Sequence, residues 1–113
     1  MSCLFCKIIA RDIPASIVYE DDAVLAFNDI NPQAPTHVLV VPKRHIESLN
    51  ALEPDDDRIV GELVRRAAAI AQERGISISG YRTVFNTNRD AGQTVCHIHL
   101  HLLGGRAMAW PPG

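Results

Sequence analysis

The sequence predicts an α+β fold, with a mostly antiparallel sheet of about five strands, one long helix and one short helix. One segment, residues 54–74, has apolar residues at three- and four-residue spacing, which is typical of an amphipathic helix. Several short apolar segments are separated by turn-forming residues, as strands are. These elements follow the order helix, hairpin, strand, helix, hairpin, which favours antiparallel pairing.

The first part of the chain is expected to contain a short helix and a hairpin. Residues 4–10 (LFCKIIA) favour a helix that ends before Asp12 and Pro14. Residues 18–20 and 23–28 are expected to be two strands, joined by an acidic two-residue turn.

A Pro-rich loop, residues 29–37, separates this hairpin from the next strand. That strand, HVLVVP at residues 37–42, should end near Pro42 because proline has no N–H to donate to a sheet ladder.

The long helix has clear signals at both ends. Pro54 suits a first helical position, and Asp55–Asp57 place negative charge at the positive end of the helix dipole. Gly75 is a natural left-handed stop. Gly61 lies inside the helix at a cost of about 1 kcal/mol relative to alanine, explained either by a close helix contact or by drift.

The remaining strands lie near the C-terminus. Residues 81–88 and 95–103 favour strands, and residues 89–94 favour the loop between them. The final RAMAWPPG is too rich in proline and glycine to extend the sheet.

Composition bounds the class of protein. A chain of 113 residues is expected to form one domain, residues 1–113, with its own core. A net charge of -2 gives no basic surface for nucleic acid or for a membrane. We expect a cytoplasmic protein because the N-terminus does not resemble a signal peptide. Three cysteines make a disulfide framework improbable and favour metal binding or packing.

Three of the five histidines, His97, His99 and His101, stand at alternate positions near the C-terminus. In a strand they would share one face at intervals of about 6.5 to 7 Å, with Cys96 and Ile98 on the opposite, buried face. A solvated face rich in histidine is one alternative. The two functional alternatives are a metal centre and phosphate chemistry, in which a neutral imidazole acts as nucleophile or base.

Cys3 and Cys6 form a C-x-x-C pair that can bind one tetrahedral metal if two further ligands are supplied. A redox pair is the competing interpretation, although no strand precedes the motif. Zinc held together with two of the histidines is the favoured one.

The motif HIHLHLL at residues 97–103 resembles the signature of the histidine triad (HIT) family of nucleotide hydrolases and transferases. Residues 5–46 and 91–113, together with the strand between them, are similar to the Hint branch of that family, the purine nucleoside phosphoramidases. The terminal LGGRAMAWPPG is particularly typical of that branch.

The resemblance implies a homodimer whose two sheets join into a ten-stranded sheet, with a nucleotide pocket in each protomer. It implies that His99 attacks the α-phosphorus and forms a covalent nucleotidyl-histidine, which water then hydrolyses. His101 would bind the phosphoryl oxygens, and His37 would support the triad. Thr94 stands where the family has a serine near the leaving amine, so the hydroxyl is kept and a methyl is added.

The resemblance also implies a purine nucleotide pocket. Asp29 would accept both ribose hydroxyls, and Trp110 would reach toward the partner protomer's site. The apolar walls around the purine would be Phe5, Ile8, Phe27, Ile30 and Leu39. Residues around the phosphate and ribose would be Asn86, Gly92, Gln93 and Val95, together with Thr94, His99 and His101. A glycine at 92 would also suit a backbone that approaches phosphate closely.

Some bacterial members of the family bind zinc, and the resemblance assigns its ligands here to Cys3, Cys6, His45 and His97. This zinc would be structural, with no catalytic metal required, because similar proteins that lack the cysteines perform the same chemistry. The sequence therefore predicts a purine nucleoside phosphoramidase. A dinucleoside polyphosphate hydrolase and a nucleotide-binding scaffold with vestigial hydrolysis remain as alternatives. The physiological amine and the choice between adenine and guanine stay open.

Overall fold

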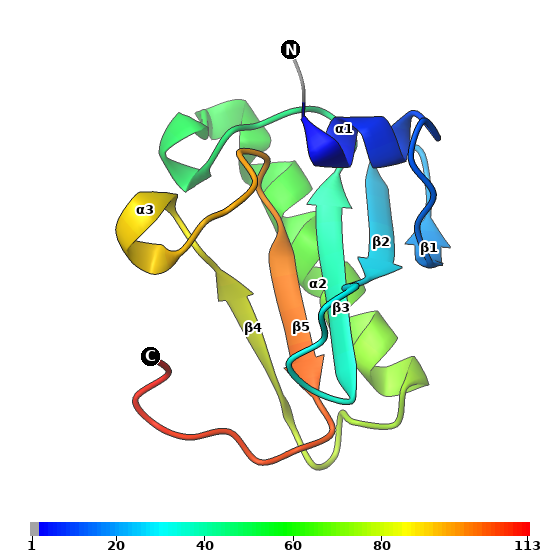
Figure 1. The fold of residues 1–113 in the computed structure, drawn as a ribbon, viewed down its shortest axis with the longest axis vertical. Coiled ribbons are helices and arrows are strands. Elements are labelled where there is room, and N and C mark those ends of the chain that lie inside the picture. Colours follow the sequence, from blue (N-terminus) through cyan, green and yellow to red (C-terminus); the bar gives the residue numbers. More distant parts are fainter. Residues whose placement is uncertain (1–2) are drawn as a thin grey trace.

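Five strands form one antiparallel sheet in the computed structural model, which describes residues 3–113. Their spatial order is β1-β2-β3-β5-β4, and every neighbouring pair is antiparallel (Figure 1). The strands are β1 (Ile17–Glu20), β2 (Val24–Asn28), β3 (Thr36–Pro42), β4 (Tyr81–Phe85) and β5 (Leu100–Gly104). The predicted fold class is confirmed.

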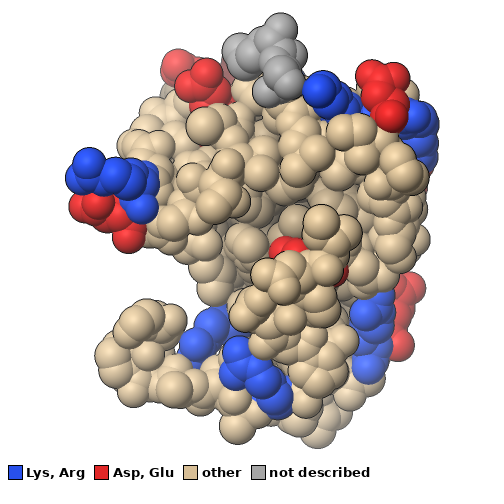
Figure 2. Space-filling view, viewed as in Figure 1, with Lys and Arg blue, Asp and Glu red and all other residues tan. Residues whose placement is uncertain are grey.

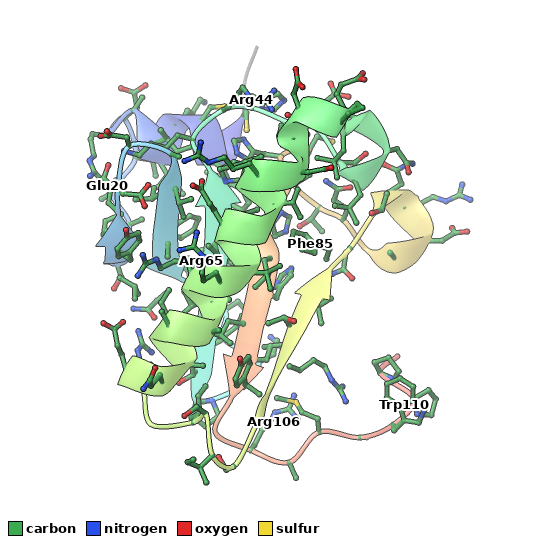
Figure 3. The ribbon with its side chains drawn as sticks, turned by 180° about the vertical axis from the view of Figure 1, so that it is seen from behind. Glu20, Arg44, Arg65, Phe85, Arg106 and Trp110 are labelled. Carbon is green, nitrogen blue, oxygen red and sulfur yellow. The ribbon has the colours of Figure 1, made fainter. Side chains whose placement is uncertain are left out.

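The helices lie on opposite sides of this sheet. The long helix α2 (Asp57–Glu73) crosses the face seen from behind in Figure 3, and its apolar side buries Leu63, Ala67 and Ile70. The short helix α1 (Leu4–Ile9) lies across one end of β2 and β3 on the other face (Figure 1). Short 3₁₀ helices, Leu49–Ala51 and Pro54–Asp56, lead into α2. Both predicted helices are confirmed to within a few residues.

Two apolar clusters fill the space on the two sides of the sheet. One lies between α2 and the sheet and includes Val38, Val40 and Leu100. The other lies under α1 and includes Phe5, Phe27, Leu39 and Val41. Every residue of β3 is buried because this central strand is covered on both faces.

The sheet register brings distant histidines together. In the β3–β5 pair, Leu39 lies opposite His101 and His37 lies opposite Leu103. His37, Leu39 and His101 therefore share the face covered by α1, because residues two apart, and residues directly opposite, point to the same side of a sheet.

The last strand is shorter than predicted, and one expectation about it is wrong. Strand β5 begins at Leu100, and the His97 N–H donates to the Val95 carbonyl at 2.9 Å, which closes a three-residue turn around Cys96. This turn interrupts the alternation, so Cys96 is exposed rather than part of the core. Ile98 is buried as expected.

Two other local features differ from the sequence expectation. Strand β4 ends at Phe85, and the predicted loop after it contains a short helix, α3 (Asn88–Ala91). Gly61 has no atom within 4 Å of the position where a side chain would begin, so helix contact does not explain this glycine. Among residues 3–113, no helix is long and apolar enough to span a membrane.

Candidate functional site

A cavity of about 300 Å³ opens between α1, the sheet and the loop after β2, on the face shown in Figure 2. Its size falls at the lower end of the range for small-molecule pockets. Ten residues predicted from the sequence line it: Phe5, Ile8, Phe27, Asp29, Ile30, Leu39, Thr94, Val95, His99 and His101. No lysine or arginine is among its lining residues, and such side chains lie mainly around the margin of this face (Figure 2).

His99 lies against the cavity with one ring nitrogen engaged by the backbone. Its Nδ1 lies 2.7 Å from the carbonyl oxygen of His97, which can only accept, so Nδ1 carries the proton and donates. The other nitrogen, Nε2, therefore holds the lone pair. The edge of the Phe5 ring packs at 5.0 Å between centroids, and burial lowers the pKa of His99. A neutral imidazole with a fixed lone pair has the properties of a nucleophile.

His101 and His37 form a contacting pair beside His99. The Nε2 of His37 lies 3.0 Å from the Nδ1 of His101. Burial, then His99 and His37, lower the pKa of His101 to about 4, although Asp29 opposes the shift. Burial also lowers the pKa of His37. Both imidazoles are therefore neutral at pH 7, and each ring has one nitrogen that donates and one that accepts.

Asp29 follows β2 and supplies a carboxylate to the cavity. One oxygen accepts the Asn31 N–H at 2.8 Å, and the other lies 3.4 Å from the Nε2 of His37. The loop that leads into β3 therefore fixes the orientation of the carboxylate, which leaves acceptor capacity directed at the cavity.

The four other predicted pocket residues lie elsewhere. Asn86 and Trp110 border a second hollow between β4 and the C-terminal tail, visible at the left of Figure 2. The Gln93 side chain donates to the Glu47 and Val95 carbonyls. Gly92 has a φ of 81° and caps α3, so a left-handed backbone, rather than close approach to a ligand, explains this glycine.

Sequence reasoning missed part of the cavity wall. Leu4, Ile13, Pro14, Ala15 and Asn28 also line it. Most of them belong to the segment that connects α1 with β1, and that segment carries no motif. Its apolar residues without helical or strand periodicity were the available signal, because such residues need a packing partner.

A second cluster, Cys3, Cys6, His45 and His97, is assembled behind His99. One donor atom from each side chain lies within 4.8 Å of all the others. The Nδ1 atoms of His45 and His97 are 3.2 Å apart. The Sγ of Cys6 lies 3.4 Å from the Nδ1 of His45 and 3.6 Å from the Nδ1 of His97. Tetrahedral zinc bonds of ~2.0–2.1 Å to nitrogen and ~2.3 Å to sulfur place such donors roughly 3.3–3.6 Å apart.

The hydrogen bonds of this cluster also suit a metal. The Nε2 of His97 donates to the Pro42 carbonyl at 2.8 Å, so its Nδ1 presents a lone pair to the cluster. Burial and the neighbouring Cys3 side chain raise the pKa of the Cys6 thiol, and a bound cation would lower it again. The described residues offer no partner to the buried Nε2 of His45. The cluster could therefore bind a metal ion.

Comparison with known proteins assigns the family. The family model described as "Scavenger mRNA decapping enzyme C-term binding" matches residues 2–109. A HIT family hydrolase of Legionella pneumophila has a solved structure that matches with a TM-score of 0.98 and 55% identity, over 99% of this chain and 100% of that one. The chain belongs to the histidine triad family. A histidine triad protein from Clostridium difficile matches with a TM-score of 0.93 and 46% identity, over 96% and 95% of the two chains.

Two curated relatives of this histidine triad protein cover nearly its full length. A HIT-like protein from Synechocystis is 52% identical over 110 residues, 97% of this chain and 96% of the relative. The purine nucleoside phosphoramidase of Escherichia coli is 50% identical over 105 residues, 93% of this chain and 88% of the relative.

Proposed function

We propose that this protein hydrolyses the P–N bond of purine nucleoside 5'-phosphoramidates, giving a nucleoside monophosphate and an amine. The observation that carries the proposal is the fixed tautomer of His99, whose Nδ1–H is held by the His97 carbonyl while Nε2 keeps its lone pair. The identity of 50% with a purine nucleoside phosphoramidase supports the substrate class.

Two steps account for the reaction. In the first, His99 Nε2 attacks the α-phosphorus and the P–N bond to the amine breaks, while the amine nitrogen takes up one proton from solvent by way of the Thr94 hydroxyl and leaves. In the second, water attacks the same phosphorus and returns one proton to solvent, the bond between phosphorus and His99 Nε2 breaks, and neutral His99 and the nucleoside monophosphate are released. A neutral His101 would donate to the phosphoryl oxygens as charge develops, and the Thr94 hydroxyl would lie near the leaving amine.

The cavity suits a nucleoside monophosphate. Phe5, Phe27 and Leu39 would pack against the purine, and the Asp29 carboxylate would accept hydrogen bonds from the two ribose hydroxyls. Since the cavity lining lacks lysine and arginine, the phosphate charge would be met by imidazole and hydroxyl donors. Ile30 is 98% exposed and would close over the base only from the rim.

Replacing His99 by alanine is the decisive test. Turnover of adenosine 5'-phosphoramidate should fall by at least about 10⁴-fold, because the attacking nitrogen is lost, while AMP binding persists. A Cys96→Ala variant is the control, because Cys96 is exposed outside the cavity. Substantial turnover by His99→Ala would contradict the nucleophile assignment. If native protein cleaves a dinucleoside polyphosphate faster than the phosphoramidate, the alternative activity replaces this one.

We also propose that Cys3, Cys6, His45 and His97 hold a structural zinc ion. Such an ion would supply cross-linking, tying α1 to the segment before β5, and no reaction step requires it. The cluster geometry and the lone pair on the His97 Nδ1 support this proposal. The three free cysteines also suit a cytoplasmic location, where thiols stay reduced.

A homodimer completes the proposal. The two sheet edges are β1, which is short and pairs irregularly, and β4. Trp110 is 82% exposed beside β4, on a tail that Arg82 holds through the Ala109 carbonyl. We infer that two β4 edges pair into a ten-stranded sheet and that Trp110 contacts the partner protomer.

A further inference from the structure

We propose that the main-chain N–H of Gln33 sets the proton positions of His37 and His101, and thereby makes His101 a hydrogen-bond donor at its Nε2. Gln33 is then a positioning residue that acts through its backbone. This inference rests on the proposed function for its catalytic consequence, but the proton positions themselves follow from hydrogen bonds of the free protein.

The first step is the contact between Gln33 and His37. The Gln33 N–H lies 3.0 Å from the Nδ1 of His37. A main-chain amide can only donate, so Nδ1 of His37 must accept and carry no proton. Because His37 is buried and its pKa is lowered, the ring is neutral and its single proton lies on Nε2.

The proton position of His37 in turn determines the proton position of His101. The protonated Nε2 of His37 lies 3.0 Å from the Nδ1 of His101, so Nδ1 accepts and holds a lone pair. A neutral His101 must then carry its proton on Nε2. Asp29, 3.4 Å from the same His37 nitrogen, favours the proton at that position as well.

The neighbouring imidazoles of His99 and His101 therefore have different roles in the proposed reaction. His99 has its proton on Nδ1 and a lone pair on Nε2, whereas His101 has the reverse arrangement. The backbone thus makes one ring a nucleophile and the next a donor for phosphoryl oxygens. The same proton positions disfavour a metal ion among Asp29, His37 and His101, because the His37 Nε2 that would bind the ion carries a proton.

Gln33 is held firmly enough to act in this way. The Arg106 Nε–H donates to the Gln33 carbonyl at 2.9 Å, from the tail just after β5 (Figure 3). The Gln33 side chain donates to the Asn31 carbonyl at 3.0 Å. The amide that points at His37 is therefore fixed on both sides.

Nitrogen-15 NMR of the native protein tests the inference without any substrate. With histidine labelled and pH near 7.5, we expect both His37 and His101 to show the tautomer protonated at Nε2, and His99 the one protonated at Nδ1. Observation of His37 or His101 protonated at Nδ1 would overturn the proposal, whether or not the protein turns out to be a phosphoramidase.

Two substitutions at one position separate the amide from the side chain. Gln33→Pro removes the N–H, and Gln33→Ala keeps it while losing the side-chain bond to Asn31. We expect kcat to fall about tenfold more in Gln33→Pro than in Gln33→Ala, with similar KM values, together with a mixed tautomer for His37. Equal kcat values for the two variants would overturn the proposal.

Failure of the inference about Gln33 and failure of the proposed phosphoramidase activity give different experimental results. If Gln33→Pro does not fold, the native NMR spectrum alone decides the proton positions. If the native protein has no phosphoramidase activity, the proposed function fails, and the tautomers of His37 and His101 still support or overturn the role of Gln33.

Discussion

At the scale of single residues, the three histidines of the triad differ because their ring nitrogens contact different groups. His97 donates to Pro42 and offers Nδ1 to the cysteine cluster. His99 donates to the His97 carbonyl through its own Nδ1, whereas the Nδ1 of His101 accepts a hydrogen bond from His37. Identical side chains two residues apart thereby acquire different chemistry, and no property of the imidazole alone distinguishes them.

The half-buried His101 makes the stability of the fold depend on pH. The pKa of His101 is about 4 in the folded protein, against an ordinary histidine value of 6.5, so between these pH values the unfolded chain binds more protons. The free energy of unfolding is undiminished by His101 above pH 6.5, and it decreases as pH falls from 6.5 toward 4. Urea unfolding should show a lower midpoint at pH 5 than at pH 7.5.

A His101→Asn variant serves as the control for this prediction. The ring is faced by His99, His37 and Asp29, and the lowered pKa of His37 acts in the same direction. The difference between the two midpoints should therefore shrink in His101→Asn without disappearing. An unchanged difference would show that His101 does not contribute.

At the scale of elements, the turn after β5 depends on a glycine. Gly105 has a φ of 93°, and an added Cβ would lie 2.9 Å from the Cβ of Pro35. Gly105→Ala should therefore lower the free energy of unfolding by about 1 to 2 kcal/mol. Gly61→Ala in α2 meets open space and should raise it by about 1 kcal/mol. Urea unfolding of both variants gives the comparison, and the same sign for both would contradict this explanation.

The cysteine cluster joins elements that are far apart in the chain. Cys3→Ala should abolish zinc content and lower the melting temperature by at least about 5 °C, because the bound ion stabilises only the folded state. Metal analysis and thermal unfolding check this, with Cys96→Ala as the matched control. Turnover should survive chelation at a temperature where the fold persists. Its complete loss there would favour a catalytic metal.

At the scale of the whole molecule, the open β4 edge predicts self-association. Sedimentation equilibrium should give twice the mass of one chain at micromolar concentration, and the amides of β4 should be protected from hydrogen exchange. A monomer whose β4 amides exchange freely would contradict pairing through this edge. All residues that line the cavity at His99 belong to one chain, so pairing of two chains would affect Trp110 rather than His99.

The sequence by itself determined the helix at α2, the strands, and the residue types of both clusters, because apolar periodicity and motif spacing are local properties. The tertiary structure decided that Cys96 is exposed, since a side-chain bond from Gln93 and a tight turn override strand alternation there. It also decided which segment completes the cavity wall. Above all, it decided the proton positions on His99 and His101, because these depend on carbonyl and amide groups that only folding brings within hydrogen-bonding distance.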